Sequence, residues 1–269
     1  MSAARILRAS DIAGAMRLKE AAGWNQTEAD WRRILDLSPE GCFGIEQGGA
    51  LAATATAICY GRDLAWIGMV LTDPAFRGRG LASLLMEHTL EFLNNRGVEC
   101  VKLDATDMGR GLYRRFGFED ECAVERWMRP PGPARPVECA PHRFEDDLDR
   151  RAFGADRREL LAELCRIQAS SVAGAGYAMG RPGSKAAYFG PCVATSRDAA
   201  ARLLEWYLGR HSAEPIYWDL LPGNEDARDL AVRYGFEPVR RLVRMTRGAS
   251  RRELGNGPEI YAIAGFEFG

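Results

Sequence analysis

An internal repeat constrains this chain more than any other feature of its sequence. Residues 110–128 read RGLYRRFGFEDECAVERWM, and residues 228–245 read RDLAVRYGFEPVRRLVRM. Gly117 aligns with Gly235 at an offset that also aligns the hydrophobic residues on either side of them. In both halves a strand, a helix and a second strand are predicted upstream of this segment. Two copies of one unit therefore predict two similar domains.

The length and a proline-rich segment support this division. A chain of 269 residues has room for two domains. Residues 128–141 read MRPPGPARPVECAP, and five prolines there can neither continue a helix nor donate to a sheet. We therefore predict a first domain over residues 1–129, a linker over residues 130–141 and a second domain over residues 142–269.

Composition excludes several classes of function. The chain has 36 basic and 37 acidic residues, a balance that argues against nucleic-acid binding driven by overall charge. Its seven cysteines form no CxxC pair, which favours reduced, mostly buried thiols. The three histidines, His88, His142 and His211, are far apart, so no metal site is predicted. No apolar run is long enough to cross a membrane, and we expect a cytoplasmic protein with no membrane partner.

The pattern of the first half predicts an α+β fold, in which helices layer both faces of a mixed sheet. Residues 64–72, LAWIGMVLT, are nearly all apolar, as in a strand buried on both faces. An amphipathic helix follows over residues 81–97. The second half is expected to open with one helix over residues 145–168 and to contain a hairpin over residues 175–190. Other predicted elements are helices 11–23, 27–38, 111–117 and 198–210, a hairpin over 41–60, and strands 98–106, 121–129, 185–195 and 215–221.

A turn rich in glycine and arginine lies between the strand over residues 64–72 and the helix over residues 81–97. Gly78 and Gly80 let the backbone curl close to an anion because neither carries a Cβ. A helix starting near Leu81 brings unpaired N–H groups and the positive end of its dipole. Arg77 and Arg79 add permanent positive charge. Together these features predict a cradle for a pyrophosphate.

Two other interpretations of the turn compete with this one. It is an ordinary surface turn with solvated arginines, or it is the start of a dinucleotide-binding GxGxxG, with Asp104 near the expected acidic position. Ser83 replaces the third glycine, and residues 73–76 separate the strand from the turn, which the dinucleotide fold does not allow. A P-loop is excluded because GK[ST] is missing.

The whole pattern resembles the GNAT superfamily of N-acetyltransferases. Residues 72–82, TDPAFRGRGLA, are similar to its acetyl-CoA motif, and Arg77, Gly80 and Ala82 fill the [QR]-x-x-G-x-[GA] positions. Residues 112–118, LYRRFGF, are similar to its second signature. The chain as a whole is similar to the tandem type, in which a degenerate GNAT-like domain follows the first. The resemblance implies acetyl-CoA as co-substrate.

The resemblance also implies roles for individual residues. Tyr113 stands at the position of the family's tyrosine acid, and a phenol can return a proton to a leaving thiolate. Thr106 replaces an asparagine that contacts the cofactor in many members. The implied cofactor-binding residues are Val70, Leu71, Thr72, Arg77, Gly78, Arg79, Gly80, Leu81, Ala82, Ser83, Thr106 and Gly109.

The acceptor end is less well marked in the sequence. Asp104, Glu28 and Asp30 are candidate general bases, with a water chain as the alternative. Trp24 and Trp31 are candidates for lining an acceptor pocket. Further along the chain, Arg181, Tyr188 and Glu267 are candidates for contacting the acceptor.

The second half has lost the features of the first. Residues 193–204, VATSRDAAARLL, contain no arginine–glycine pair, and Ala231 stands where the first copy has Tyr113. We therefore predict that this half binds no coenzyme A. Residues 259–269 alternate as a strand does, and such a strand can fill the gap of a splayed sheet.

These features predict an N-acetyltransferase that moves the acetyl group of acetyl-CoA to a primary amine by direct attack. The expected acceptor is a small-molecule or peptide amine, and the resemblance allows a homodimer. The alternative function is a non-catalytic sensor that binds acyl-CoA in the same cradle. A nicotinamide-dependent oxidoreductase is the third hypothesis.

Overall fold

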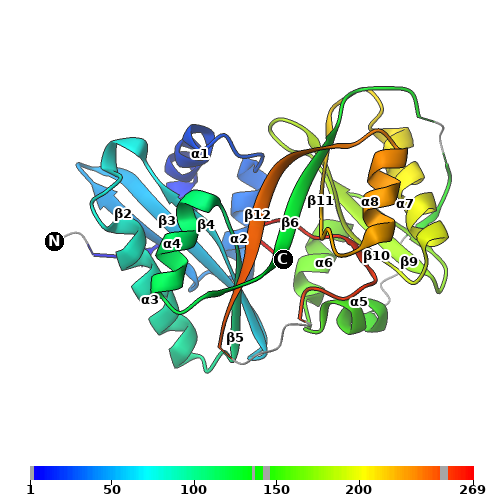
Figure 1. Cartoon of the computed structure of the whole chain (residues 1–269). Coiled ribbons are helices and arrows are strands. Elements are labelled where there is room, and N and C mark those ends of the chain that lie inside the picture. Colours follow the sequence, from blue (N-terminus) through cyan, green and yellow to red (C-terminus); the bar gives the residue numbers. More distant parts are fainter. Residues whose placement is uncertain (1–2, 135–136, 142–145, 249–253) are drawn as a thin grey trace.

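In the part of the chain that the structure describes, 13 strands form one mixed sheet with helices packed on both sides of it (Figure 1). The computed structural model of the chain describes residues 3–134, 137–141, 146–248 and 254–269. His142 lies outside these ranges. The strand order is β1-β2-β3-β4-β5-β12-β6-β11-β10-β9-β8-β7, and β13 pairs with β10.

The first half follows the predicted order of elements. Thr27 caps α2 (Glu28–Leu37), because its hydroxyl accepts a hydrogen bond from the Asp30 amide. The hairpin turns at Gly48 and Gly49, both with positive φ. The elements are β1 (Arg5–Ile6), η1 (Ala9–Asp11), α1 (Ile12–Ala21), α2 (Glu28–Leu37), β2 (Cys42–Gln47), β3 (Ala50–Tyr60), β4 (Leu64–Thr72), η2 (Pro74–Phe76), α3 (Leu81–Asn95), β5 (Cys100–Ala105), α4 (Asp107–Arg115) and β6 (Glu119–Arg129).

The second half differs from its prediction at its first helix. Residues 145–168 were expected to form one helix, but the described part holds two, α5 and α6, because Gly154 at φ 83° ends the first. Residues 176–194 form the expected hairpin. The elements are β7 (Ala140–Pro141), α5 (Asp146–Phe153), α6 (Arg158–Cys165), β8 (Ala169–Val172), β9 (Gly176–Arg181), β10 (Ala187–Ala194), α7 (Arg197–Arg210), β11 (Ile216–Leu220), α8 (Glu225–Arg233), β12 (Glu237–Gly248) and β13 (Ile260–Ala262).

Alternation along β4 shows how the layers form. Leu64 and Trp66 pack into a core with residues of α1 and α2, whereas Ala65 and Ile67 pack into another core with residues of α3. Successive side chains of a strand point to opposite faces, so an all-apolar strand buries both of them. The first of these cores also takes in side chains of α5 and α6, so it continues from one half of the chain into the other.

The two halves exchange their last long strands. β12 lies between β5 and β6, and its residues Val243–Gly248 pair antiparallel with β5. β6 in turn pairs with β11 of the second half. These two strands cross between the lobes in Figure 1. Each repeat therefore completes the sheet of the other.

A buried ion pair marks each exchanged strand. Arg126 of β6 donates to both carboxylate oxygens of Asp219 in β11, at 2.7 and 2.6 Å. Arg244 of β12 donates to those of Asp104 in β5, at 2.9 and 3.2 Å. The two arginines occupy matching positions of the internal repeat. The exchange is thus symmetric in its chemistry as well as in its strand order.

Candidate active site

The strands β4 and β5 separate at the centre of the first half. They pair in parallel from Leu64 to Trp66 of β4, and among the described residues no later part of β4 pairs with β5. β5 nevertheless continues to Ala105. The backbone of Val70, Leu71 and Thr72 therefore borders an opening on the side that faces β5.

A bulge in β4 produces this separation. Thr56 of β3 is opposite Gly68, but Thr54 is opposite Leu71, so β4 has an extra residue between these pairs. Met69 takes a φ of 49°, which is rare for a residue with a side chain. The Thr54 hydroxyl donates to the Met69 carbonyl at 2.8 Å and holds the bulge in place.

The glycine–arginine turn lies between the short helix η2, which follows β4, and the start of α3. Gly78 and Gly80 have φ of 74° and 78°, and a Cβ built at either position meets open space. Glycine is therefore needed at these positions for their positive φ, and the outer side of the turn stays free of side chains. The first hydrogen bond of α3 runs from the Leu84 amide to the Gly80 carbonyl. The amides of residues 81–83 come before this bond and have no acceptor within the helix.

The charged groups of the turn differ in their contacts. Arg79 donates to the Ala75 carbonyl at 3.3 Å and lies over the ring of Phe76. No hydrogen bond or ion pair of the Arg77 side chain occurs within the described ranges. Leu81 is buried beneath the turn, while Ala82 and Ser83 are half-buried beside it. The turn thus combines accessible amides with positive charge, which suits a pyrophosphate.

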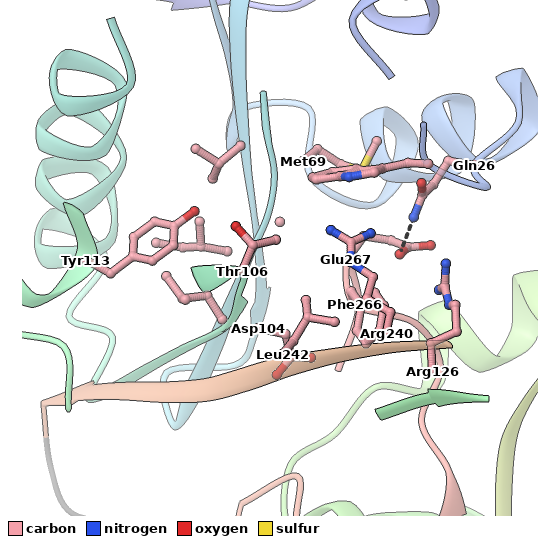
Figure 2. Close-up of a pocket in the computed structure, with 15 residues that line it drawn as sticks. Gln26, Met69, Asp104, Thr106, Tyr113, Arg126, Arg240, Leu242, Phe266 and Glu267 are labelled. Atoms are coloured by element: carbon pink, nitrogen blue, oxygen red, sulfur yellow. Dashed lines mark hydrogen bonds between the residues drawn. The ribbon is translucent and has the colours of Figure 1, made fainter. Parts of the chain in front are cut away.

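Across the opening, α4 presents Tyr113. Thr106 caps this helix by accepting a hydrogen bond from the Gly109 amide at 3.2 Å, while its side chain also lines the cavity. A Cβ on Gly109 would come within 3.0 Å of the Tyr113 ring, so glycine lets the ring lie against the helix. Burial raises the pKa of Tyr113 well above its ordinary value. Its hydroxyl points into the cavity in Figure 2 and stays protonated at neutral pH.

The cavity extends from Tyr113 to a segment from the far end of the chain. The cavity is lined by residues of β4, β5, α4, β6 and β12, by Trp24 and Gln26, and by residues 266–267. Glu267 lies so close to β4 that a Cβ on Gly68 would come within 2.8 Å of its Cα. The Trp66 indole donates to the Phe266 carbonyl at 3.0 Å and fixes this segment. Residues from both halves of the chain therefore form one site.

Glu267 belongs to a buried network of charges. Arg181 donates to it at 2.7 Å and to Asp30 at 3.0 Å. Gln26 donates its amide N–H to the other oxygen of Glu267 at 2.8 Å (Figure 2). Burial raises the pKa of Glu267, although Arg181 opposes the shift. Burial also disfavours a charged Asp30, but Arg181, Thr27 and Arg33 lower its pKa overall.

The other candidates from the sequence have different positions. Asp104 lines the cavity but is held by Arg244, and burial raises its pKa. Glu28 is exposed and pairs with Arg32. Trp24 lines the cavity as predicted, whereas Trp31 is buried in the core, so its predicted role was wrong. Arg181 and Tyr188 are also buried and lie behind the cavity wall.

In the second half the corresponding opening is filled. β13 pairs with β10 at Cys192 and Val193, and the Ile263 amide donates to the Asp219 carbonyl at 3.0 Å. The terminal segment therefore occupies the gap as predicted, although its strand covers only Ile260–Ala262 of the expected residues 259–269. The start of α7 is closed by Ser196, whose hydroxyl accepts from the Ala199 amide.

Comparison with known proteins agrees with this geometry. Residues 14–118 match the family model of the acetyltransferase (GNAT) family, and residues 146–262 match that of an acetyltransferase (GNAT) domain. The uncharacterized N-acetyltransferase YhbS of Escherichia coli (strain K12) is 37% identical over 132 residues, which cover 45% of this chain and 76% of YhbS. The chain belongs to the GNAT family.

Two further proteins resemble this GNAT chain over most of its length. The uncharacterized N-acetyltransferase YitH of Bacillus subtilis (strain 168) is 25% identical over 249 residues, 86% of each chain. A crystal structure from Pyrococcus horikoshii, assigned as an acetyltransferase, superposes with a TM-score of 0.85 at 23% identity and covers 100% of this chain and 96% of that one. This likeness extends the shared fold to both halves. The protein is a tandem GNAT acyltransferase, as the sequence predicts.

Several cavity residues were not anticipated from the sequence, and three of them shape the acceptor end. Gln26 and Arg240 line the acceptor end, and Gly68 admits the terminal segment. None lies in a motif, and the only available signal was a glycine inside an apolar strand, which often marks a close approach of backbone. Within the described ranges, no helix is long and apolar enough to cross a membrane, and no cluster of side chains is suited to a metal ion.

Proposed function

We propose that this GNAT protein transfers the acetyl group of acetyl-CoA to a primary amine by direct attack. The observation that carries the proposal is the separation of β4 from β5 after Trp66, with the buried Tyr113 lining the opening and the glycine–arginine turn following the end of β4. Acetyl-CoA would supply the thioester whose carbonyl carbon is attacked. The turn amides and Arg77 would hold its pyrophosphate.

The remaining chemistry is assigned to the chain's own residues. The free backbone of Val70 to Thr72 orients the acyl group as an added strand would be oriented. The amine nitrogen forms the new C–N bond as the C–S bond breaks, and Tyr113 gives its proton to the departing sulfur. Glu267, the carboxylate at the acceptor end, is placed to take the proton that the amine loses.

Release of free coenzyme A, followed with a thiol reagent across a panel of amines, tests transfer directly. Tyr113→Phe should lower kcat about 10²- to 10⁴-fold, the usual contribution of a general acid, while the Kd for acetyl-CoA stays nearly constant. Tyr234→Phe is the matched control, because Tyr234 contacts Glu205 in the second half, away from the cavity.

Two results would contradict the proposal. If acetyl-CoA binds but no amine releases coenzyme A above the hydrolysis background, the protein is an acyl-CoA sensor and not an enzyme of this reaction. If Tyr113→Phe retains the full rate, Tyr113 is not the acid.

A further inference from the structure

The acceptor end of the cavity has an unbalanced charge. Four charged side chains line the cavity: Asp104, Arg126, Arg240 and Glu267. Three of them form ion pairs with residues behind the cavity wall: Asp104 with Arg244, Arg126 with Asp219, and Glu267 with Arg181. Arg240 makes no hydrogen bond or ion pair with any described residue. The cavity therefore carries one positive charge that the protein does not neutralise.

The surroundings of Arg240 make this charge costly. Its side chain is half-buried. The Trp24 ring, whose centre is 5.9 Å from the guanidinium carbon, offers a weak attraction but no acceptor for the guanidinium N–H groups. In the pairing of β12 with β6 it lies opposite Arg126, another cation. Burial and Arg126 together lower the pKa of Arg240. An anion bound here would relieve both effects, and guanidinium groups bind carboxylates and phosphates through paired N–H donors.

Hydrogen-bond acceptors lie at the same end of the cavity. Because the Glu267 carboxylate can only accept, the Gln26 amide must turn its nitrogen toward it. The other end of the Gln26 amide, Oε1, is then buried without a partner. A buried carbonyl oxygen that lacks a donor is unfavourable, so this atom suits an N–H group of a ligand.

We propose that the acceptor is an amine that also carries an anionic group, a carboxylate or a phosphate. Its amine is recognised by Gln26 Oε1 and the Glu267 carboxylate, and its anion by the Arg240 guanidinium. The inference rests on the proposed acetyl transfer and specifies its substrate class. Figure 2 shows these three side chains together at one end of the cavity, with Tyr113 at the other.

Matched pairs of amines test the subsite. Amino acids are compared with the same amines lacking the carboxylate, and amino-sugar phosphates with the unphosphorylated amino sugars, by kcat/KM from coenzyme A release. The wild-type protein should prefer one of the two anionic sets about 10- to 100-fold, in line with a partly buried charged hydrogen bond. The set that shows the preference identifies the anion as carboxylate or phosphate.

Variants then assign the preference to one residue. Arg240→Gln should reduce the anionic-to-neutral ratio to near 1, mainly through KM. Arg241→Gln is the control, because Arg241 is the exposed neighbour on the same strand and does not line the cavity. If the wild-type protein shows equal kcat/KM for the anionic and the neutral amines, or if Arg240→Gln leaves their ratio unchanged, the subsite is overturned and acetyl transfer is left intact.

A binding measurement separates the two proposals if no amine is acetylated. Calorimetric titration of the anionic amines into protein loaded with coenzyme A should then still show binding that Arg240→Gln abolishes and Arg241→Gln retains. That result would keep the subsite while the transfer proposal fails. Absence of binding in the wild-type protein would overturn the subsite as well.

Discussion

The exchange of strands between the halves predicts an unusually large cost for losing Arg244. This side chain is fully buried and donates four hydrogen bonds: two to Asp104, one to the Gly255 carbonyl at 2.7 Å and one to Asn256 at 2.8 Å. Arg244→Met leaves the Asp104 carboxylate buried and unpaired. Removing one partner of a buried ion pair costs about 3–5 kcal/mol in the free energy of unfolding.

At about 2–4 °C per kcal/mol for a chain of this size, Tm should fall by about 6–20 °C. Differential scanning calorimetry measures the shift, and Arg241→Met on the exposed side of β12 is the control. Adding Asp104→Leu to Arg244→Met should recover part of the lost stability, because the buried, unpaired Asp104 carboxylate is then removed. A shift no larger than that of the control, or a double variant no more stable than the single one, would refute the proposed role of this pair.

Three other variants or measurements follow from the site. Burial raises the pKa of Glu267 above its ordinary value of 4.5, so the proposed base is protonated and inactive at acidic pH. The value of kcat at saturating substrates should therefore rise with pH through a midpoint above 4.5, and Glu267→Gln should remove this rise. A pH profile that Glu267→Gln leaves unchanged excludes Glu267 as the base. Gly80→Ala forces a side chain into φ 78°, so the free energy of unfolding should fall by about 1–2 kcal/mol and acetyl-CoA should bind more weakly; tight binding at full stability would contradict the cradle. Calorimetry should give one acetyl-CoA per chain, because β13 fills the second opening, and a stoichiometry of two would contradict this.

The local elements were predictable because their signals are local. The all-apolar β4, the Thr27 cap and the hairpin at Gly48 and Gly49 each depend on a few neighbouring residues. The turn before α3 was predictable for the same reason, since glycine is the residue that accepts positive φ at little cost. The single helix expected over residues 145–168 was wrong because its apolar spacing continues across Gly154, whose left-handed conformation ends α5.

The pairing of strands across the two halves was not predictable in this way. β6 and β12 have similar sequences, and nothing in either specifies whether it joins its own half or the other. The choice is made by contacts between distant residues, such as Arg244 with Asp104, that no local pattern records. Gln26 and Arg240 were missed for the same reason, because each becomes a site residue only when the fold brings them together.

The exchange also gives the degenerate half a role in the proposed reaction. The cofactor turn and Tyr113 come from the first half, but Arg240 lies on β12 and Glu267 on the terminal segment, both from the second. The second repeat can therefore lose its own cradle and still be required, because it supplies much of the acceptor end. Substitutions that change acceptor preference should then fall in β12 and residues 266–267 as well as at Trp24 and Gln26, while those that change affinity for acetyl-CoA should cluster around the turn before α3.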